Sequence, residues 1–159
     1  MLNIIKNFVQ NIGGEMSNIH VLERLLNNLE GYVNDLKNAD DINYDKYLKD
    51  IRSQRFVERT LQIAIECCLD ITHHIISEQG FREPTSYADA FSVLSENNIL
   101  AIESLNEYKP MAQFRNKIVH SYDKIDPEQV FGLFKKHLGT FDRFRDEIKI
   151  YLKGRGVAS

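Results

Sequence analysis

The chain has few residues that constrain the backbone: proline occurs three times and cysteine only twice among 159 residues. Low proline content is typical of helical globular proteins. The cysteines, Cys67 and Cys68, are neighbours, and neighbouring side chains on a helix point about 100° apart, so no disulfide is expected between them. Reduced thiols are typical of the cytoplasm, where we expect this protein to be.

The sequence also lacks an excess of positive charge, since its formal net charge is -3. Proteins that bind nucleic acid mainly through nonspecific phosphate contacts are usually strongly basic, so any such binding requires a local basic cleft. No segment has the ~18–20 apolar residues of a membrane span, and no signal peptide is visible. No Gly-x-x-x-x-Gly-Lys loop is present, which excludes the usual phosphate-binding site of ATPases.

What the sequence contains is helical periodicity, without strand-type alternation or a fixed repeat. We predict an all-α fold, an antiparallel bundle of four or five helices. Apolar residues recur at steps of three and four along the chain. The first two expected helices cover residues 18–37, capped by Ser17 or Asn18, and residues 44–77. A short helix then begins at Thr85 or Ser86, another is opened by Pro110, and the last runs from Pro127 to about residue 152 with Asp126 as its cap.

The expected domain organisation is one helical domain over residues 18–153, followed by a frayed tail over 154–159. Residues 1–17 form an N-terminal extension that is either helical or foreign to the native protein. The second alternative rests on Gly13, Gly14 and Glu15, because their codons can spell a purine-rich ribosome-binding sequence before Met16.

The residues with the clearest chemical potential are Arg115, Asn116, His120 and Tyr122, near the end of a predicted helix. Taken alone, an arginine and a histidine at this spacing also suit a solvated helix end. The order Arg-Asn-x3-His-x-Tyr, however, resembles the Arg-x4-His-x-Tyr motif of HepT-like toxins in the HEPN superfamily. The likeness extends over roughly residues 21–152, including the segments 58–76, 81–87 and 111–116.

This resemblance implies a HEPN-like homodimer that acts as a metal-independent endoribonuclease on mRNA or tRNA, with no cofactor. It also implies a toxin–antitoxin pair, in which a nucleotidyltransferase antitoxin of the MntA type silences the toxin by AMPylation of Tyr122. An alternative is a noncatalytic helical protein that binds a nucleotide or docks a nucleotidyltransferase. A metal-containing bundle is a further alternative.

The residue types fit RNA cleavage without a metal. Histidine exchanges protons near neutral pH, and the arginine fork donates paired hydrogen bonds to phosphate. We therefore predict that His120 is general base, general acid or both, that Arg115 stabilises charge, and that Asn116 orients its neighbours or contacts phosphate. A five-residue step turns a helix by about 140° net, so either the helix loosens before His120 or two chains share the site.

Other polar residues are weaker candidates. Asp70 is predicted to hold Arg115 or His120 in place, with a surface or capping role as the alternative. An arginine stripe that could line an RNA groove, or simply be solvated, comprises Arg52, Arg55 and Arg59. His73 and His74 follow Asp70, but no second Asp/Glu-x-x-His step exists, so no metal site is predicted.

Overall fold

The computed structural model describes residues 2–155, except the side chains of 7–12, 15 and 16. Within this part of the chain all regular structure is helical, as predicted. The α-helices are α1 (Leu2–Lys37), α2 (Tyr44–Lys49), α3 (Ile51–Gln79), α4 (Tyr87–Glu96), α5 (Leu105–His120), α6 (Pro127–Lys136) and α7 (Gly139–Gly154), and two short 3-10 helices are η1 (Ile102–Ser104) and η2 (Tyr122–Lys124).

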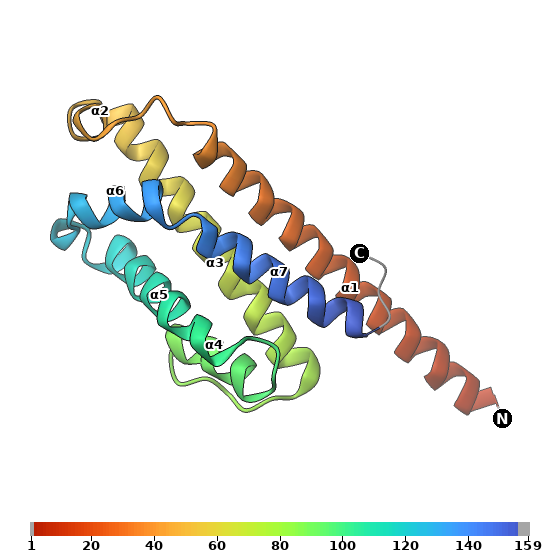
Figure 1. The fold of residues 1–159 in the computed structure, drawn as a ribbon. Helices are drawn as coiled ribbons and strands as arrows, with labels where there is room; N and C mark the ends of the chain where they lie inside the picture. The colour runs from red at the N-terminus through yellow and green to blue at the C-terminus, as the bar shows by residue number, and fades with distance from the viewer. Residues whose placement is uncertain (1, 156–159) are drawn as a thin grey trace.

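The four long helices α1, α3, α5 and α7 alternate in direction, so the bundle is antiparallel (Figure 1). Helix α3 lies at its centre and contacts α1, α4, α5 and α7. Its buried face includes Leu61, Ala64, Ile65 and Cys68, which recur at helical spacing. Because α3 is covered on several sides, its remaining polar residues are confined to a narrow strip, and this strip forms much of the candidate site.

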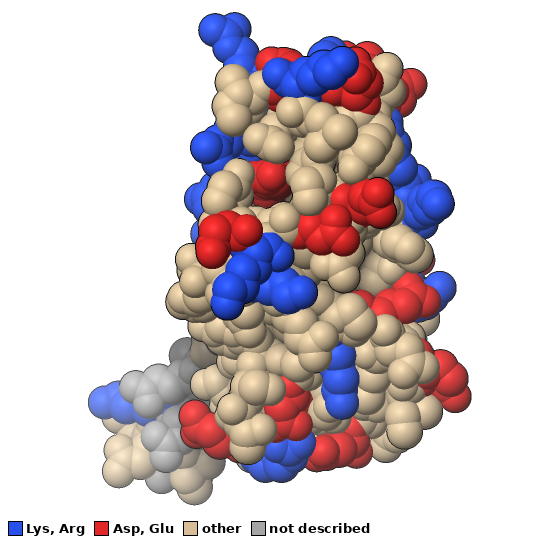
Figure 2. Space-filling model, turned by 90° about the vertical axis from the view of Figure 1, so that its left-hand side faces the viewer, with Lys and Arg blue, Asp and Glu red and all other residues tan. Residues whose placement is uncertain are grey.

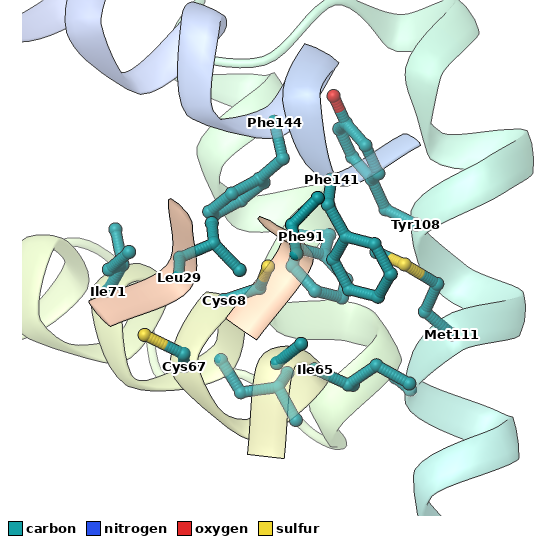
Figure 3. Close-up of a cluster of buried hydrophobic side chains, with 14 of the residues drawn as sticks. Leu29, Ile65, Cys67, Cys68, Ile71, Phe91, Tyr108, Met111, Phe141 and Phe144 are labelled. Carbon is teal, nitrogen blue, oxygen red and sulfur yellow. The ribbon is translucent and has the colours of Figure 1, made fainter. Parts of the chain in front are cut away.

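The core is rich in aromatic side chains, several of which meet edge to face (Figure 3). Phe91 of α4, Tyr108 of α5 and Phe144 of α7 have ring centroids 5.5 to 6.0 Å apart. Cys67 and Cys68 are buried free thiols that pack as small hydrophobic residues. Burial raises the pKa of the Cys67 thiol to about 11, which makes it a poor nucleophile at neutral pH.

Helix α1 does not begin at Ser17 or Asn18, as the capping pattern predicted, but runs unbroken from Leu2. Gly13 and Gly14 lie within it, because two glycines weaken a helix without terminating it. Its first turns extend beyond the bundle (Figure 1), and Leu2, Ile4 and Ile5 are exposed. Residues 1–17 thus include a helical extension. Most of the predicted tail, residues 156–159, lies outside the described part.

Three other predicted boundaries were wrong. The expected helix 44–77 is divided at Asp50, whose extended backbone ends α2 while its carboxylate caps α3 by accepting hydrogen bonds from the amides of Arg52 and Ser53. Pro110 lies inside α5 because η1 and Leu105 begin the helical path upstream. The expected final helix is divided at His137 and Leu138 into α6 and α7, which lets Phe134 and Phe141 both enter the core.

The loop before α4 is held by charged groups. The Asp89 carboxylate accepts hydrogen bonds from both terminal nitrogens of Arg82, at 2.8 and 2.9 Å, and from the amide of Thr85 at 2.8 Å. Arg82 also donates to Glu96. These bonds fix residues 82–86 against α4, and part of this loop lines the candidate site.

Asp89→Asn should destabilise the protein in a pH-dependent way. The hydrogen bonds from Arg82 and Thr85 hold the pKa of Asp89 below its ordinary value, so its contribution is fully present above the unfolded value and lost as pH falls below ~4. We expect a loss of about 1 kcal/mol at pH 7, after allowance for solvent screening, and less at pH 3. Denaturant unfolding measures the loss of stability at both pH values, and Asp45→Asn, at an exposed position, is the control. An equal loss at both pH values would contradict the prediction.

Candidate active site

The predicted motif lies at the C-terminal end of α5 and in the turn that follows. Helix α5 stays regular through His120, and the amide of Ser121 still donates to the carbonyl of Lys117 at 2.8 Å. The helix therefore does not loosen before His120. Arg115 and His120 consequently leave α5 in different directions, as the rotation of about 140° requires.

Arg115 points toward α3 and is largely covered, with 17% of its side chain exposed. Its Nε donates to Glu66 Oε1 at 3.2 Å, and its guanidinium carbon lies 5.1 Å from the centroid of the Tyr87 ring. Its Nη1 lies 3.5 Å from Asn116 Oδ1, at the limit of a hydrogen bond. Arg115 is thus fixed between an acid on α3 and an aromatic ring on α4.

The acid that pairs with Arg115 is Glu66, one turn before the predicted Asp70. Asp70 is exposed and acts on Arg115 through its charge. Neighbouring atoms exclude part of the water around its carboxyl group, and this partial desolvation, with the repulsion of Glu66, raises the pKa of Asp70, while His73 and Arg115 oppose the rise. Gln62 donates from Nε2 to the same Glu66 oxygen at 3.0 Å, so two neighbours orient the carboxylate.

His120 and Asn116 line an open groove between α5 and the loop that precedes α4. Other groove residues are His73, Glu83, Pro84, Thr85, Ser86, Tyr87, Lys117 and Ser121. Tyr87 forms part of the wall, and the guanidinium of Arg115 lies over its ring. His120 is exposed, so its imidazole is available to a ligand in this groove or to a second chain.

Tyr122 lies two residues beyond the end of α5, in η2, and its hydroxyl contacts α3. The hydroxyl donates to Glu58 Oε2 at 2.7 Å and accepts a hydrogen bond from Arg55 Nη1 at 2.8 Å. The Arg55 guanidinium carbon also lies 5.4 Å from the centroid of the Tyr122 ring. With 44% of its surface exposed, Tyr122 remains accessible from solvent.

The arginine stripe reaches the motif through one member. Arg52, Arg55 and Arg59 are all exposed, and Arg55 contacts Tyr122. Figure 2, which shows the side of the molecule at the left of Figure 1, has Lys and Arg mixed with Asp and Glu. Any attraction of this side for phosphate therefore comes from individual basic side chains rather than from a continuous basic patch.

Sequence reasoning missed Glu58, Glu66 and Tyr87. A signal for the two acids existed, because Glu58, Gln62, Glu66 and Asp70 recur every four residues along a helix whose other faces are mostly apolar. Such a row lies on one side of α3. Nothing in the sequence around Tyr87 indicates that its ring lies under Arg115, because that contact joins α4 to α5.

No three His, Cys, Asp or Glu side chains converge as metal ligands in the part of the chain whose structure is described. His73 donates from Nδ1 to the carbonyl of Leu69 at 2.8 Å and meets Tyr87 edge to face. Among the described residues, no helix is both long and apolar enough to span a membrane.

Comparison with known proteins places this site in a family context. The tRNA nuclease HepT of Aphanizomenon flos-aquae is 32% identical over 139 residues, which cover 86% of this chain and 95% of that protein. The mRNA nuclease HepT of Shewanella oneidensis is 33% identical over 104 residues, 65% of this chain and 78% of that protein.

A solved structure, described as the tri-AMPylated Shewanella oneidensis HEPN toxin in complex with MNT antitoxin, has a similar fold. Its TM-score is 0.75 at 26% identity, and the match covers 82% of this chain and 97% of that one. The resemblance noted in the sequence and the predicted all-α HEPN-like fold are therefore confirmed. The family description "Ribonuclease HepT-like" matches residues 22–148, so the chain belongs to the ribonuclease HepT-like family.

Proposed function

We propose that this chain is the toxin of a bacterial toxin–antitoxin pair and cleaves RNA without a metal ion or cofactor. The observation that carries the proposal is the environment of Arg115, which Glu66 and Tyr87 fix beside a groove lined by Asn116 and His120. The similarity to two named RNA nucleases, one matched over 95% of its length, also supports RNA cleavage as the proposed activity.

The roles of the residues follow from their chemistry. Cleavage of an RNA strand at its own 2′-hydroxyl needs a base for that proton, an acid for the leaving oxygen and positive charge at the phosphate. His120 serves as general base or acid, since an imidazole can both accept and donate a proton. Arg115 stabilises charge on the phosphate. Asn116 lines the groove and contacts the phosphate or orients Arg115.

We infer that two chains complete one site. Arg115 is directed toward α3, whereas the exposed His120 leaves α5 about 140° further round the helix. A homodimer with a two-fold axis near this end brings Arg115 of one chain toward His120 of the other and supplies separate acid and base groups. It also brings together arginines that the net charge of -3 conceals.

The arginine stripe extends this site along α3. We propose that Arg52, Arg55 and Arg59 contact phosphates on either side of the cleaved bond. Their spacing places them on one helix face, and all three are exposed.

Cleavage in the absence of metal tests the proposed activity. Protein purified and assayed in EDTA should degrade RNA and leave 2′,3′-cyclic phosphate ends, because the attacking group is the 2′-hydroxyl. Gel electrophoresis with end-group analysis makes the measurement, and the same preparation with Mg²⁺ is the control. Inert protein that still binds its nucleotidyltransferase would favour the noncatalytic docking alternative, and activity only with added metal would favour a metal-containing site.

We propose further that a partner nucleotidyltransferase of the MntA type silences the toxin by AMPylation of Tyr122. Tyr122 is 44% exposed and lies two residues beyond His120, so an attached AMP brings bulk and negative charge into a phosphate site. Incubation with that partner and Mg²⁺-ATP should add adenylyl mass to the wild type and lower cleavage about tenfold or more. Intact-mass analysis of wild type and Tyr122→Phe provides the test, and an adduct on both would contradict it.

A further inference from the structure

A buried carboxylate lies against the hydroxyl of Tyr122. Glu58 is only 6% exposed, yet its two oxygens accept hydrogen bonds from two phenols, Oε1 from Tyr47 at 3.0 Å and Oε2 from Tyr122 at 2.7 Å. Arg55 donates from Nη1 to the same Tyr122 oxygen at 2.8 Å. The oxygen of Tyr122 is thus held between a proton acceptor and a cation.

A phenol in this position needs a base to remove its proton when it reacts with phosphorus. An ordinary tyrosine has a pKa of ~10 and is protonated at neutral pH. Burial, and the hydrogen bond and charge of Glu58, raise the pKa of Tyr122, while Arg55 opposes this rise. The proton must therefore leave during the attack, to a base within ~2.6–3.2 Å. Glu58 Oε2 lies within that distance and already accepts the phenolic hydrogen.

We propose that Glu58 is the general base for nucleotidyl transfer to Tyr122, so that the modified chain carries part of the catalytic apparatus for its own modification. This inference rests on the proposed modification of Tyr122. The Tyr122 oxygen attacks the α-phosphorus of a nucleoside triphosphate bound by the partner enzyme. A new O–P bond forms, the bond from the α-phosphorus to pyrophosphate breaks, and the phenolic proton moves to Glu58 Oε2.

The surroundings of Glu58 suit it to this step. Tyr47, from α2, holds the other oxygen and so keeps Oε2 directed at Tyr122. Arg55 is exposed, on the side from which a triphosphate can approach, and its charge stabilises the negative charge that develops on the transferred phosphate.

The test uses the full chain with its partner nucleotidyltransferase and Mg²⁺-ATP. Single-turnover modification of Tyr122 is followed by intact mass between pH 6.5 and 9. We expect Glu58→Gln to slow modification by about 10²–10⁴-fold, the usual contribution of a general base. Its residual rate should rise about tenfold per pH unit with the phenolate fraction, whereas the wild-type rate should be nearly flat.

Asp123→Asn, which removes the exposed carboxylate next to Tyr122, is the matched control and should stay within about threefold of wild type.

A fluorinated, more acidic tyrosine at position 122 should restore much of the rate to Glu58→Gln, because a weakly held proton needs no base. If Glu58→Gln fails to fold, Glu58→Asp replaces it; this variant keeps a carboxylate but withdraws it by one methylene, and it should be about tenfold slower or more.

Different results would contradict the modification of Tyr122 and the role of Glu58. A wild type that gains no adduct overturns the modification of Tyr122 and the role of Glu58 together. A modified wild type, with folded Glu58 variants that react equally fast and share its pH profile, overturns the role of Glu58 alone.

Discussion

Replacing His120 with alanine is expected to lower the rate of RNA cleavage by about 10²–10⁴-fold, because positioned proton transfer contributes that much. His120 is exposed at the last residue of α5 and lines the groove, so its removal leaves the core intact. Arg115→Ala should cost about 10²–10³-fold, as for other groups that stabilise developing charge. Initial rates on a labelled RNA measure both effects.

His137→Ala is the matched control for His120. His137 is also an exposed histidine at a helix end, but it lies beyond α6, in a separate cavity of about 360 Å³ with Met111, Phe114 and Leu133. Its replacement should leave cleavage near the wild-type rate. A His120→Ala protein as active as the wild type would remove His120 from the mechanism and leave the noncatalytic alternative.

Pairing of two inactive chains should restore activity. If Arg115 of one chain works with His120 of its partner, a heterodimer of Arg115→Ala and His120→Ala keeps one intact site and has roughly half of the wild-type rate. Each parent homodimer has lost about 10²-fold or more, so the restoration is large. Heterodimers are isolated by co-expression with two different affinity tags, and cleavage is measured as for the wild type.

The converse heterodimer makes this experiment decisive. Wild type paired with a chain that carries both substitutions keeps Arg115 and His120 only on one chain. It should be inactive if the site is shared between chains and half active if the site lies within one chain. The reverse pattern, with the first heterodimer inactive and the second active, would contradict the two-chain site.

The sequence was most informative where its local pattern is strong. Ser86, one of the two predicted starts, caps α4 by accepting from the amide of Asp89, and Asp126 caps α6 as predicted. Both follow from short-range hydrogen bonds that the residues form with their own neighbours. The boundaries at Pro110 and His137 were missed, because tertiary packing decides whether a helix continues through such a residue. The boundary at Asp50 had a local signal that was overlooked, since its carboxylate caps α3 through the amides of Arg52 and Ser53.

By itself, the sequence determined the helical class and the residues of the Arg115–Tyr122 motif. These depend on periodicity and on residue type, which are properties of the chain. Only the tertiary structure decided that Glu66 rather than Asp70 pairs with Arg115, and that Glu58 and Arg55 meet the hydroxyl of Tyr122. Those contacts join residues 49, 64 and 67 positions apart. They exist because α3 packs against α5 and η2, and no local pattern specifies which members of a polar row on α3 will face them.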